Sequence, residues 1–377
     1  MTNPNLSPGP LLDAMFEHGA SDLLLSVGAA PMVRIDGALA PLDMPTLEPE
    51  DTERLSRELL GVPQRLTFSD RQTVDFSFQW GAYGRVRGNA YRQRGTISIA
   101  LRAIPTHIPT FDELHLPQAV RDLAKLPHGL ILVTGPTGCG KSTTQASLLD
   151  SINRERPVHI ITIEDPIEYT HDNHSAVVDQ REIGHDAPSF ADALRSTLRE
   201  DPDVVQVGEM RDLESIAIAL TIAETGHLVL GTLHSNDAAQ AIHRVVDVFP
   251  AGQQQQIRTQ LGSTLSCVIH QELLPKIGGG RVAAFEVMMA TPAVRNLIRE
   301  NKAGQLRNVI ATSSKDGMFT LEAALTALVE SGMVDYEDAV SRSLFPNEIR
   351  RNPMTLSGTA QEPTFQPMAA SSLKHAG

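Results

Sequence analysis

The feature that most constrains this 377-residue chain is an eight-residue run, Gly135-Pro-Thr-Gly-Cys-Gly-Lys-Ser142. It fits the pattern of a phosphate-binding loop, in which a glycine and four residues precede Gly-Lys-Ser or Gly-Lys-Thr. Apolar residues at 130–133 lead into the run, and helix-forming sequence at 143–149 follows it. In that context the glycines let consecutive amides converge on anionic oxygens, and the helix N-terminus adds favourable partial charge. The run therefore predicts a strand, a phosphate-binding loop and a helix.

A nucleoside triphosphate with a metal ion is the ligand that this loop predicts. Lys141 is expected to reach the β- and γ-phosphates of ATP, and the Ser142 hydroxyl to ligate Mg²⁺. Cys139 would stand at a helix N-terminus, which can lower the pKa of a thiol, so we hypothesise that it is sensitive to oxidation. The loop residues predicted to bind ATP are Gly135, Pro136, Thr137, Gly138, Cys139, Gly140, Lys141, Ser142 and Thr143.

The sequence around the loop alternates short apolar runs with segments of helix length. Four such runs lie at 129–134, 159–163, 204–208 and 227–232. This alternation is typical of βαβ units, whose parallel strands are buried on both faces. We therefore predict an α/β core with a mainly parallel sheet over residues 118–350, mostly helical after Phe249.

Residues 10–104 have a different pattern, which predicts a small α+β domain. We expect a helix at 11–18, and strands at 22–27 and 32–35, with a third strand after the turn Asp36-Gly37. A meander is expected at 74–80, 85–91 and 96–102. Prolines punctuate 105–117, which we interpret as a linker; 1–9 is interpreted as a flexible N-terminus and 351–377 as a disordered tail.

Carboxylates follow two of the predicted core strands. Glu209 comes directly after 204–208, the position of a Walker B carboxylate. Glu164, Asp165 and Glu168 end another apolar strand, and clustered carboxylates suit Mg²⁺ coordination and water activation. Whether Glu164 or Glu209 activates water stays open. The predicted metal ligands are Ser142, Glu164 and Asp165.

Histidines bracket the strand predicted at 227–232. His234 would lie at its carboxyl end, where ligands bind in open α/β sheets, and is a candidate γ-phosphate sensor. His227 stands at the other end. Arginines also crowd the predicted meander, as a solvated basic face or as groups that neutralise a transferring phosphoryl group. These arginines are Arg85, Arg87, Arg92, Arg94 and Arg102.

Composition narrows the classes of function. A net charge of −13 and 4% aromatic residues argue against direct nucleic-acid binding. Two cysteines cannot form a four-thiolate zinc site or a disulfide framework. The N-terminus lacks the pattern of a signal peptide, and no apolar run approaches the roughly 20 residues that span a bilayer. We expect a cytoplasmic protein whose association with a membrane goes through a partner or through a surface of its own.

These segments, in this order, resemble the secretion ATPase superfamily of type II secretion and type IV pili. More narrowly they resemble the PilT retraction ATPases, over roughly residues 10–345. The resemblance rests on the phosphate loop, an "Asp box" at 162–168, a Walker B segment at 198–212 and a "His box" at 225–234. Two C-terminal segments, 293–300 and 317–322, resemble retraction-ATPase signatures.

The resemblance implies a PAS-like N-terminal domain joined to a RecA-like core, assembled as a homohexamer with ATP between domains and neighbouring subunits. It implies a motor that drives type IV pilus retraction and twitching motility. The implied partners are an inner-membrane platform protein (PilC-like) and a PilU-like paralogue, at the inner face of the cytoplasmic membrane at the pilus base. The site residues carried over are Glu164, Glu209, His227 and His234, with Arg87, Arg94 and Arg102 reaching the phosphates.

Some positions differ from the residues that are usual in this family. Leu24 stands where histidine is frequent, Val294 replaces isoleucine, and the turn at 91–95 is one residue shorter, which weakens the transfer of the arginines. Alternatives are an accessory PilU-like ATPase, a pilus extension or secretion ATPase, a RecA-like DNA translocase and a silent scaffold. Too few residues before the N-terminal domain, and too few cysteines, argue against the extension and secretion type.

Overall fold

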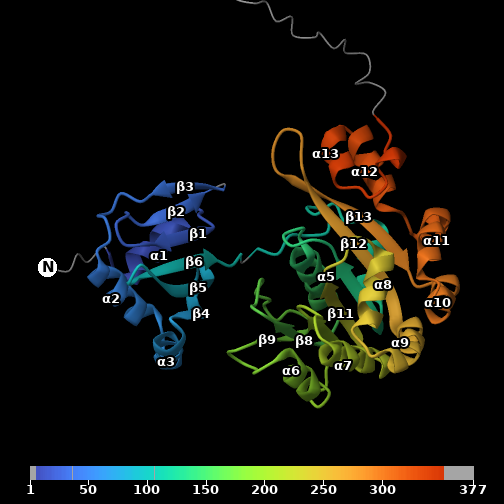
Figure 1. Cartoon of the computed structure of the whole chain (residues 1–377), viewed down its shortest axis with the longest axis horizontal. Coiled ribbons are helices and arrows are strands. Elements are labelled where there is room, and N and C mark those ends of the chain that lie inside the picture. Colours follow the sequence, from blue (N-terminus) through green and yellow to red (C-terminus); the bar gives the residue numbers. More distant parts are fainter. Residues whose placement is uncertain (1–5, 36, 106, 352–377) are drawn as a thin grey trace, which may run out of the picture.

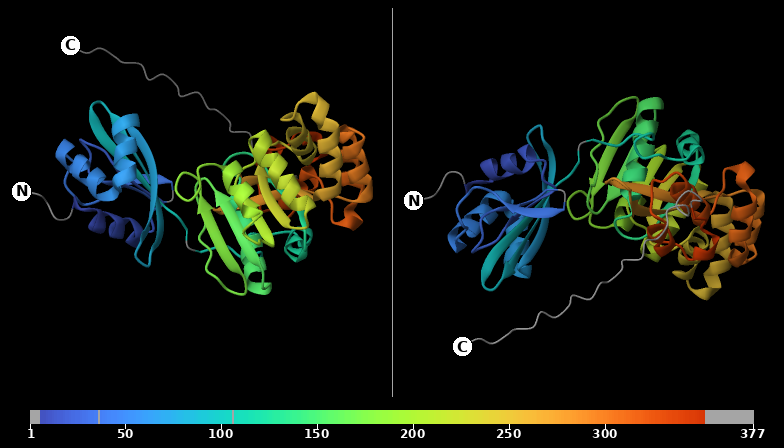
Figure 2. Two further views of the ribbon diagram at one scale, coloured as in Figure 1. Left: turned by 90° about the horizontal axis from the view of Figure 1, so that it is seen from below. Right: turned by 90° about the horizontal axis from the view of Figure 1, so that it is seen from above.

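The computed structural model describes residues 6–35, 37–105 and 107–351. Most of the predicted tail, five residues of the predicted flexible N-terminus and Asp36 of the predicted turn therefore lie outside the described residues. Figures 1 and 2 show two bodies side by side, joined by one connecting chain. Each body is built on its own sheet.

The N-terminal body is a six-stranded antiparallel sheet with three helices. Its strand order is β3-β2-β1-β6-β5-β4, so the chain returns from the edge strand β4 to the centre. Leu23, Ile99 and Leu101 of the central strands are buried beneath α1 and α2. The strands are β1 (Asp22–Leu25), β2 (Met32–Ile35), β3 (Ala38–Pro41), β4 (Thr73–Trp80), β5 (Gly84–Gln93) and β6 (Thr96–Ala103); the helices are α1 (Pro8–Glu17), α2 (Pro49–Leu59) and α3 (Val62–Arg71).

The strands of this body lie where the alternating pattern predicted them, whereas α2 and α3 were not predicted. Pro49 starts α2, and the Glu48 amide donates to the Asp51 carboxylate at 3.1 Å, which satisfies a backbone group at the helix start. Both helices are short, with Leu55 of α2 and Phe68 of α3 buried against the body, and helices of this length depend on tertiary packing for most of their stability.

The second body is a seven-stranded sheet in the order β13-β12-β7-β11-β10-β8-β9. All neighbouring strands are parallel except β12 and β13, which form an antiparallel hairpin. The strands are β7 (Gly129–Thr134), β8 (His159–Glu164), β9 (Val177–Glu182), β10 (Val204–Val207), β11 (Leu228–Leu233), β12 (Leu265–Pro275) and β13 (Arg281–Met289). The four predicted core strands correspond to β7, β8, β10 and β11.

Helices cover both faces of this sheet. Buried residues of α6 to α11 form one apolar layer with the sheet, and those of α4, the 3-10 turn Asp122–Lys125 and α5 form the other. A smaller cluster packs α12 and α13 on the β12–β13 hairpin (Figure 1). The helices are α4 (Gln118–Arg121), α5 (Lys141–Glu155), α6 (Phe190–Thr197), α7 (Leu213–Glu224), α8 (Ala238–Asp247), α9 (Ala251–Thr264), α10 (Pro292–Arg299), α11 (Leu306–Thr312), α12 (Leu321–Glu330) and α13 (Tyr336–Ser341).

The prediction of a mostly helical chain after Phe249 holds for α9 to α13 but missed one β-hairpin. After α9 the chain forms the long β12–β13 hairpin, in which β12 pairs with β7 and β13 forms the edge of the sheet. The polar run His270-Gln271-Glu272 interrupts the apolar pattern of β12, although His270 and Gln271 are both 1% exposed. Gln271 finds its partners far away in the chain, at Cys139 and Thr144, so the local pattern did not indicate a buried strand. None of the helices in the described part of the chain has the length and apolar character needed to span a bilayer.

Glu286 provides a test of this packing. It lies in β13, is 4% exposed, and accepts the Ala238 amide at the start of α8 at 2.7 Å. Burial raises the pKa of Glu286 from 4.5 to about 7. The native state therefore binds this proton more tightly than the unfolded state, and the resulting stability is present below pH 4.5 and is lost as pH rises through about 7.

We predict that Glu286→Gln, which keeps an acceptor for the Ala238 amide, removes the loss of folding stability at higher pH. Its melting temperature should match that of the wild type near pH 5 and exceed it at pH 8, by an amount equivalent to on the order of 3 kcal/mol. Thermal denaturation across pH 5–8 measures the difference. If the melting temperatures of the two proteins change with pH by the same amount, the raised pKa assigned to Glu286 is contradicted.

Candidate active site

The loop after β7 is held in a conformation that favours glycine. Gly135, Gly138 and Gly140 have φ values of 143°, 77° and 91°, a region that residues with a Cβ adopt at a cost. Lys141, at the start of α5, folds back over the loop, and its Nζ donates to the carbonyl oxygens of Gly135 at 3.0 Å and Pro136 at 2.9 Å. The ammonium group is thus placed over the concave face of a loop whose amides lead into a helix N-terminus.

Gln271 of β12 supports the loop from the sheet side, a role that the sequence pattern missed. Its side-chain amide donates to the Cys139 carbonyl, and its Oε1 accepts the hydroxyl of Thr144 in α5 at 2.8 Å. Its own carbonyl oxygen lies only 2.3 Å from where a Cβ on Gly135 would stand. One buried glutamine therefore connects the loop, the first turn of α5 and the neighbouring strand.

The Cys139 side chain points into this packed region and is 2% exposed. Burial raises the pKa of its thiol, and this effect is larger than the opposing effect of the nearby Lys141 charge. The hypothesis that Cys139 is a low-pKa, oxidation-sensitive thiol is therefore wrong, because the side chain turns inward and loses contact with water.

A cavity of about 1140 Å³ opens above the loop, bounded by the carboxyl ends of the parallel strands and by the N-terminal body. Residues from distant parts of the chain meet here, as expected where neighbouring parallel strands end together. The predicted site residues that line it are Thr137, Gly138, Cys139, Gly140, Lys141, Ser142, Thr143, Glu164, Asp165, Glu209, His234, Arg87 and Arg102. Gly135 and Pro136 border a smaller hollow of about 390 Å³, which His234 also lines.

Glu164 ends β8 in a buried, hydrogen-bonded environment. Oε1 accepts Thr162 Oγ1 at 2.7 Å and Gln180 Nε2 at 3.2 Å, and Oε2 accepts the Glu168 amide at 3.3 Å. Burial nevertheless dominates, and raises the pKa of Glu164 above its ordinary value. Glu164 is therefore a more basic carboxylate than an exposed glutamate, with a fixed orientation.

Glu209, which follows β10, lies in a more polar environment. Its Oε1 lies 3.2 Å from Nε2 of His234 and forms an ion pair with Arg211. Gly208 allows the close approach of this segment to β8, because a Cβ there would stand 3.0 Å from the Ile163 carbonyl oxygen. The two glutamates thus border one cavity in different surroundings, an arrangement that separates the roles of paired carboxylates.

Arg87 and Arg102 form the wall contributed by the N-terminal body. They are direct cross-strand neighbours in β5 and β6, and both line the cavity. Two like charges opposite each other destabilise a sheet unless something compensates them. Asp22 pairs with Arg102 at 2.7 Å, whereas the Arg87 side chain forms no hydrogen bond or ion pair with any of the described residues. This wall therefore fits a polyanion in the cavity.

Two predicted site residues lie elsewhere. His227 precedes β11 at the amino ends of the strands, on the order of 20 Å from the phosphate loop by strand length. There its Nδ1 lies 3.0 Å from both Thr225 Oγ1 and the Ile222 carbonyl oxygen. Arg94 lies in the exposed turn between β5 and β6, with φ of 47°. Neither residue lines the cavity within one chain, since the sheet direction and the hairpin turn carry them away from it.

The oxygen ligands bordering the cavity fit a magnesium ion. Ser142, Glu164 and Asp165 all line it, and hydroxyl and carboxylate oxygens are the ligands that Mg²⁺ prefers. In the described residues, no group of three or more His, Cys, Asp or Glu side chains is placed to hold a metal by itself. Mg²⁺ commonly binds through one or two protein ligands together with phosphate oxygens and water, and such a site needs no larger cluster of side chains.

A buried strand, a glycine-rich loop ending in Lys-Ser, a helix, and carboxylates on the neighbouring parallel strands define a P-loop protein. Residues 98–340 match the family described as Type II/IV secretion system protein. The type IV pilus retraction ATPase PilT of Pseudomonas aeruginosa is 47% identical over 89% of this chain and 98% of its own length. The type IV pilus ATPase PilU of the same organism is 39% identical over 90% of this chain and 89% of its own.

A solved structure gives the same result. A crystal structure described as the pilus retraction motor PilT with bound ADP superimposes with a TM-score of 0.86 and 49% identity, covering 91% of this chain and 98% of that one. The chain therefore belongs to the type II/IV secretion system family, and within it to the PilT-type ATPases.

The contact between Gly135 and Gln271 predicts how the loop responds to an added methyl group. Gly135→Ala places a Cβ 2.3 Å from the Gln271 carbonyl oxygen and 2.7 Å from Cys139 Sγ, so the loop must shift and Cys139 must move. In Gly138→Ala the Cβ has no atom within 4 Å, and only the backbone conformation is strained. We predict that Cys139 reacts with a thiol reagent at least about tenfold faster in Gly135→Ala, since a tenfold change needs only about 1.4 kcal/mol.

The measurement is the rate of modification by a chromogenic disulfide in a Cys267→Ala background, with Gly138→Ala as the matched control. Equal rates in the two alanine variants would show that the close contact does not hold the cysteine in place.

Proposed function

We propose that this protein is an ATPase motor that uses the energy of ATP hydrolysis to retract a type IV pilus. The observation that carries the proposal is the meeting of three groups at one cavity: a phosphate loop, two carboxylates on parallel strands, and a pair of arginines from a second domain. The relatives named for pilus retraction and the PilT structure named with bound ADP support it.

Phosphate binding is assigned to the loop and the start of α5. The amides of the loop would donate to the β-phosphate, and Lys141 would exchange its carbonyl partners for phosphate oxygens. Ser142 and Asp165 would hold a magnesium ion, which supplies charge neutralisation at the β- and γ-phosphates. Gln271 keeps the loop in the receptive conformation.

Water activation is assigned to Glu164, and orientation of the reacting groups to Glu209 and His234. Burial raises the pKa of Glu164 above its ordinary value, as suits a group that accepts a proton from water. As that proton leaves, the water oxygen bonds to the γ-phosphorus, and the bond to the bridging β,γ oxygen breaks. His234, 3.2 Å from Glu209, links this carboxylate to the end of β11 and senses whether the γ-phosphate is present.

Force generation is assigned to movement between the two bodies. Arg87 and Arg102 face the phosphate loop across the cavity, so a bound triphosphate attracts the N-terminal body toward the core, and hydrolysis weakens that attraction. In this proposal residues 10–104 form a PAS-like domain, 105–117 a linker and 118–350 a RecA-like domain. A homohexamer would bring His227 and Arg94 to subunit boundaries, where they can act on a neighbour's site.

The setting we propose is the cytoplasmic face of the membrane at the pilus base. There the ring would act on a PilC-like platform protein, alongside a PilU-like paralogue. An accessory role of the PilU kind is the second candidate, because the PilU relative matches 90% of this chain. A principal motor should turn over ATP and retract pili without a paralogue, whereas an accessory ATPase should depend on one.

The proposal is tested by steady-state ATPase activity with Mg²⁺ and mass photometry on the same samples. We predict that Glu164→Gln and Glu209→Gln each lower kcat roughly 100-fold or more, since a positioned acid or base contributes at least that much. Glu214→Gln, a carboxylate change at an exposed site in the first turn of α7, is the matched control and should stay within about twofold of wild type.

Mass photometry should show a particle of six chains of 40.9 kDa each. A monomer without turnover, or full activity in both Gln variants, would overturn the motor proposal.

A further inference from the structure

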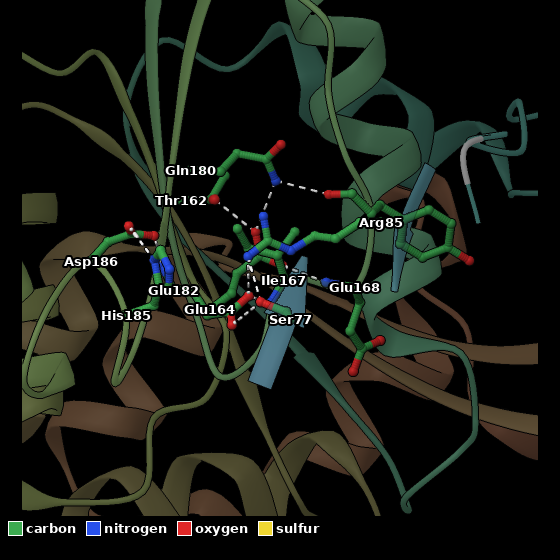
Figure 3. Close-up of polar contacts among 11 residues, drawn as sticks. Ser77, Arg85, Thr162, Glu164, Ile167, Glu168, Gln180, Glu182, His185 and Asp186 are labelled. Atoms are coloured by element: carbon green, nitrogen blue, oxygen red, sulfur yellow. Dashed lines mark hydrogen bonds and ion pairs between the residues drawn. The ribbon is translucent and has the colours of Figure 1, made fainter. Parts of the chain in front are cut away.

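Glu182, at the end of β9, joins the two bodies of the molecule (Figure 3). It is 7% exposed, and its carboxylate accepts hydrogen bonds from both sides of the interface. From the N-terminal body, Ser77 Oγ donates to Oε1 at 2.8 Å and Arg85 Nη2 donates to Oε2 at 3.0 Å. From the core, the Ile167 amide donates to Oε2 at 3.3 Å.

The core side of this contact is the loop that begins with Glu164. Glu164 and Glu182 are neighbours in the β8–β9 register, and the Ile183 amide donates to the Glu164 carbonyl oxygen at 2.8 Å. The two carboxylates then hold consecutive amides of one loop, since Glu182 binds that of Ile167 and Glu164 binds that of Glu168. The position of Glu182 therefore sets where the loop after Glu164 lies.

The N-terminal side of this contact moves with the arginine wall of the cavity. Arg85 and Arg87 are two residues apart in β5, so their side chains leave the same face of the strand. Arg87 lines the cavity, whereas Arg85 is half-buried and binds Ser77 at 2.7 Å and Glu182. A movement that brings Arg87 toward the cavity must also move Arg85 relative to Glu182.

We propose that Arg85 and Glu182 are positioning residues that couple the placement of the N-terminal body to the orientation of Glu164. The inference rests on the proposed function. The Arg85–Glu182 pair acts through the Ile167 amide, so it changes the catalytic step without touching nucleotide. Arg85 Nε is buried without a hydrogen-bond partner among the described residues, so the pair is not fully satisfied in this arrangement, as expected of a contact that is remade during a cycle.

The test is a double-mutant cycle of Arg85→Gln and Glu182→Gln, with two readouts. Each single variant should lower kcat roughly tenfold, because a small misplacement of a reacting group is costly, while KM for MgATP changes less than about threefold. The double variant should be no slower than the worse single variant, because both changes break the same contact. Arg92→Gln, on the same strand but exposed, is the matched control and should leave kcat within about twofold.

The second readout needs no turnover. Hydrogen exchange of the peptide covering 165–170, without nucleotide, should quicken in both single variants and stay unchanged in Arg92→Gln, because the acceptor at position 182 is no longer held against the Ile167 amide by its ion pair with Arg85. If Glu182→Gln does not fold, Arg85→Lys carries the same test, since lysine keeps the charge and should retain part of both kcat and protection.

The outcomes separate the two claims. If the wild-type protein hydrolyses ATP but Arg85→Gln behaves like Arg92→Gln in both readouts, the proposed coupling is overturned. The motor proposal is then unaffected. If the two single variants lose protection at 165–170 but the wild-type protein does not hydrolyse ATP, the motor proposal is overturned and the role of the Arg85–Glu182 contact stands. Additive losses in the double variant would show that Arg85 and Glu182 act separately, against the proposal.

Discussion

The structure depends on the close packing of the phosphate loop against β12. A Cβ on Gly135 would collide with the Gln271 carbonyl oxygen, and the Gln271 side chain bonds both the loop and α5. Because a buried amide must find partners for its donors and acceptors, this arrangement fixes the loop, the helix and the strand as one unit. The ends of β8, β10 and β11 then fall around the same cavity.

Charged residues of the N-terminal body connect it to this unit in two ways. The cross-strand pair Arg87 and Arg102 concentrates positive charge opposite the loop, which favours an anion between the bodies. The contact of Arg85 with Glu182 instead joins protein to protein, beside Glu164. One strand, β5, therefore carries both Arg87, which faces the cavity, and Arg85, which binds Glu182 beside the loop after Glu164.

Much of the core and of the site could be predicted from the sequence, because short apolar runs and the Gly-Lys-Ser pattern are local signals. They placed β7, β8, β10 and β11, and brought Lys141, Glu164, Glu209 and His234 to one cavity. The β12 strand was missed because its buried polar groups find partners such as Thr144, 127 residues away, which no local pattern reports. For the same reason Gln271 and Glu182 were not singled out, and His227 and Arg94 were placed at a site that they do not reach within one chain.

We propose that the phosphates of ATP bind between the 135–142 loop and the wall formed by Arg87 and Arg102. A cryo-electron microscopy structure of the full chain with Mg²⁺ and a non-hydrolysable ATP analogue tests it most directly. We expect phosphate oxygens at hydrogen-bonding distance from the loop amides and Lys141, with Arg87 or Arg102 of the N-terminal body on the opposite side of the γ-phosphate. A triphosphate bound away from the 135–142 loop, or one bound there with no arginine of the N-terminal body within reach from any subunit, would contradict it.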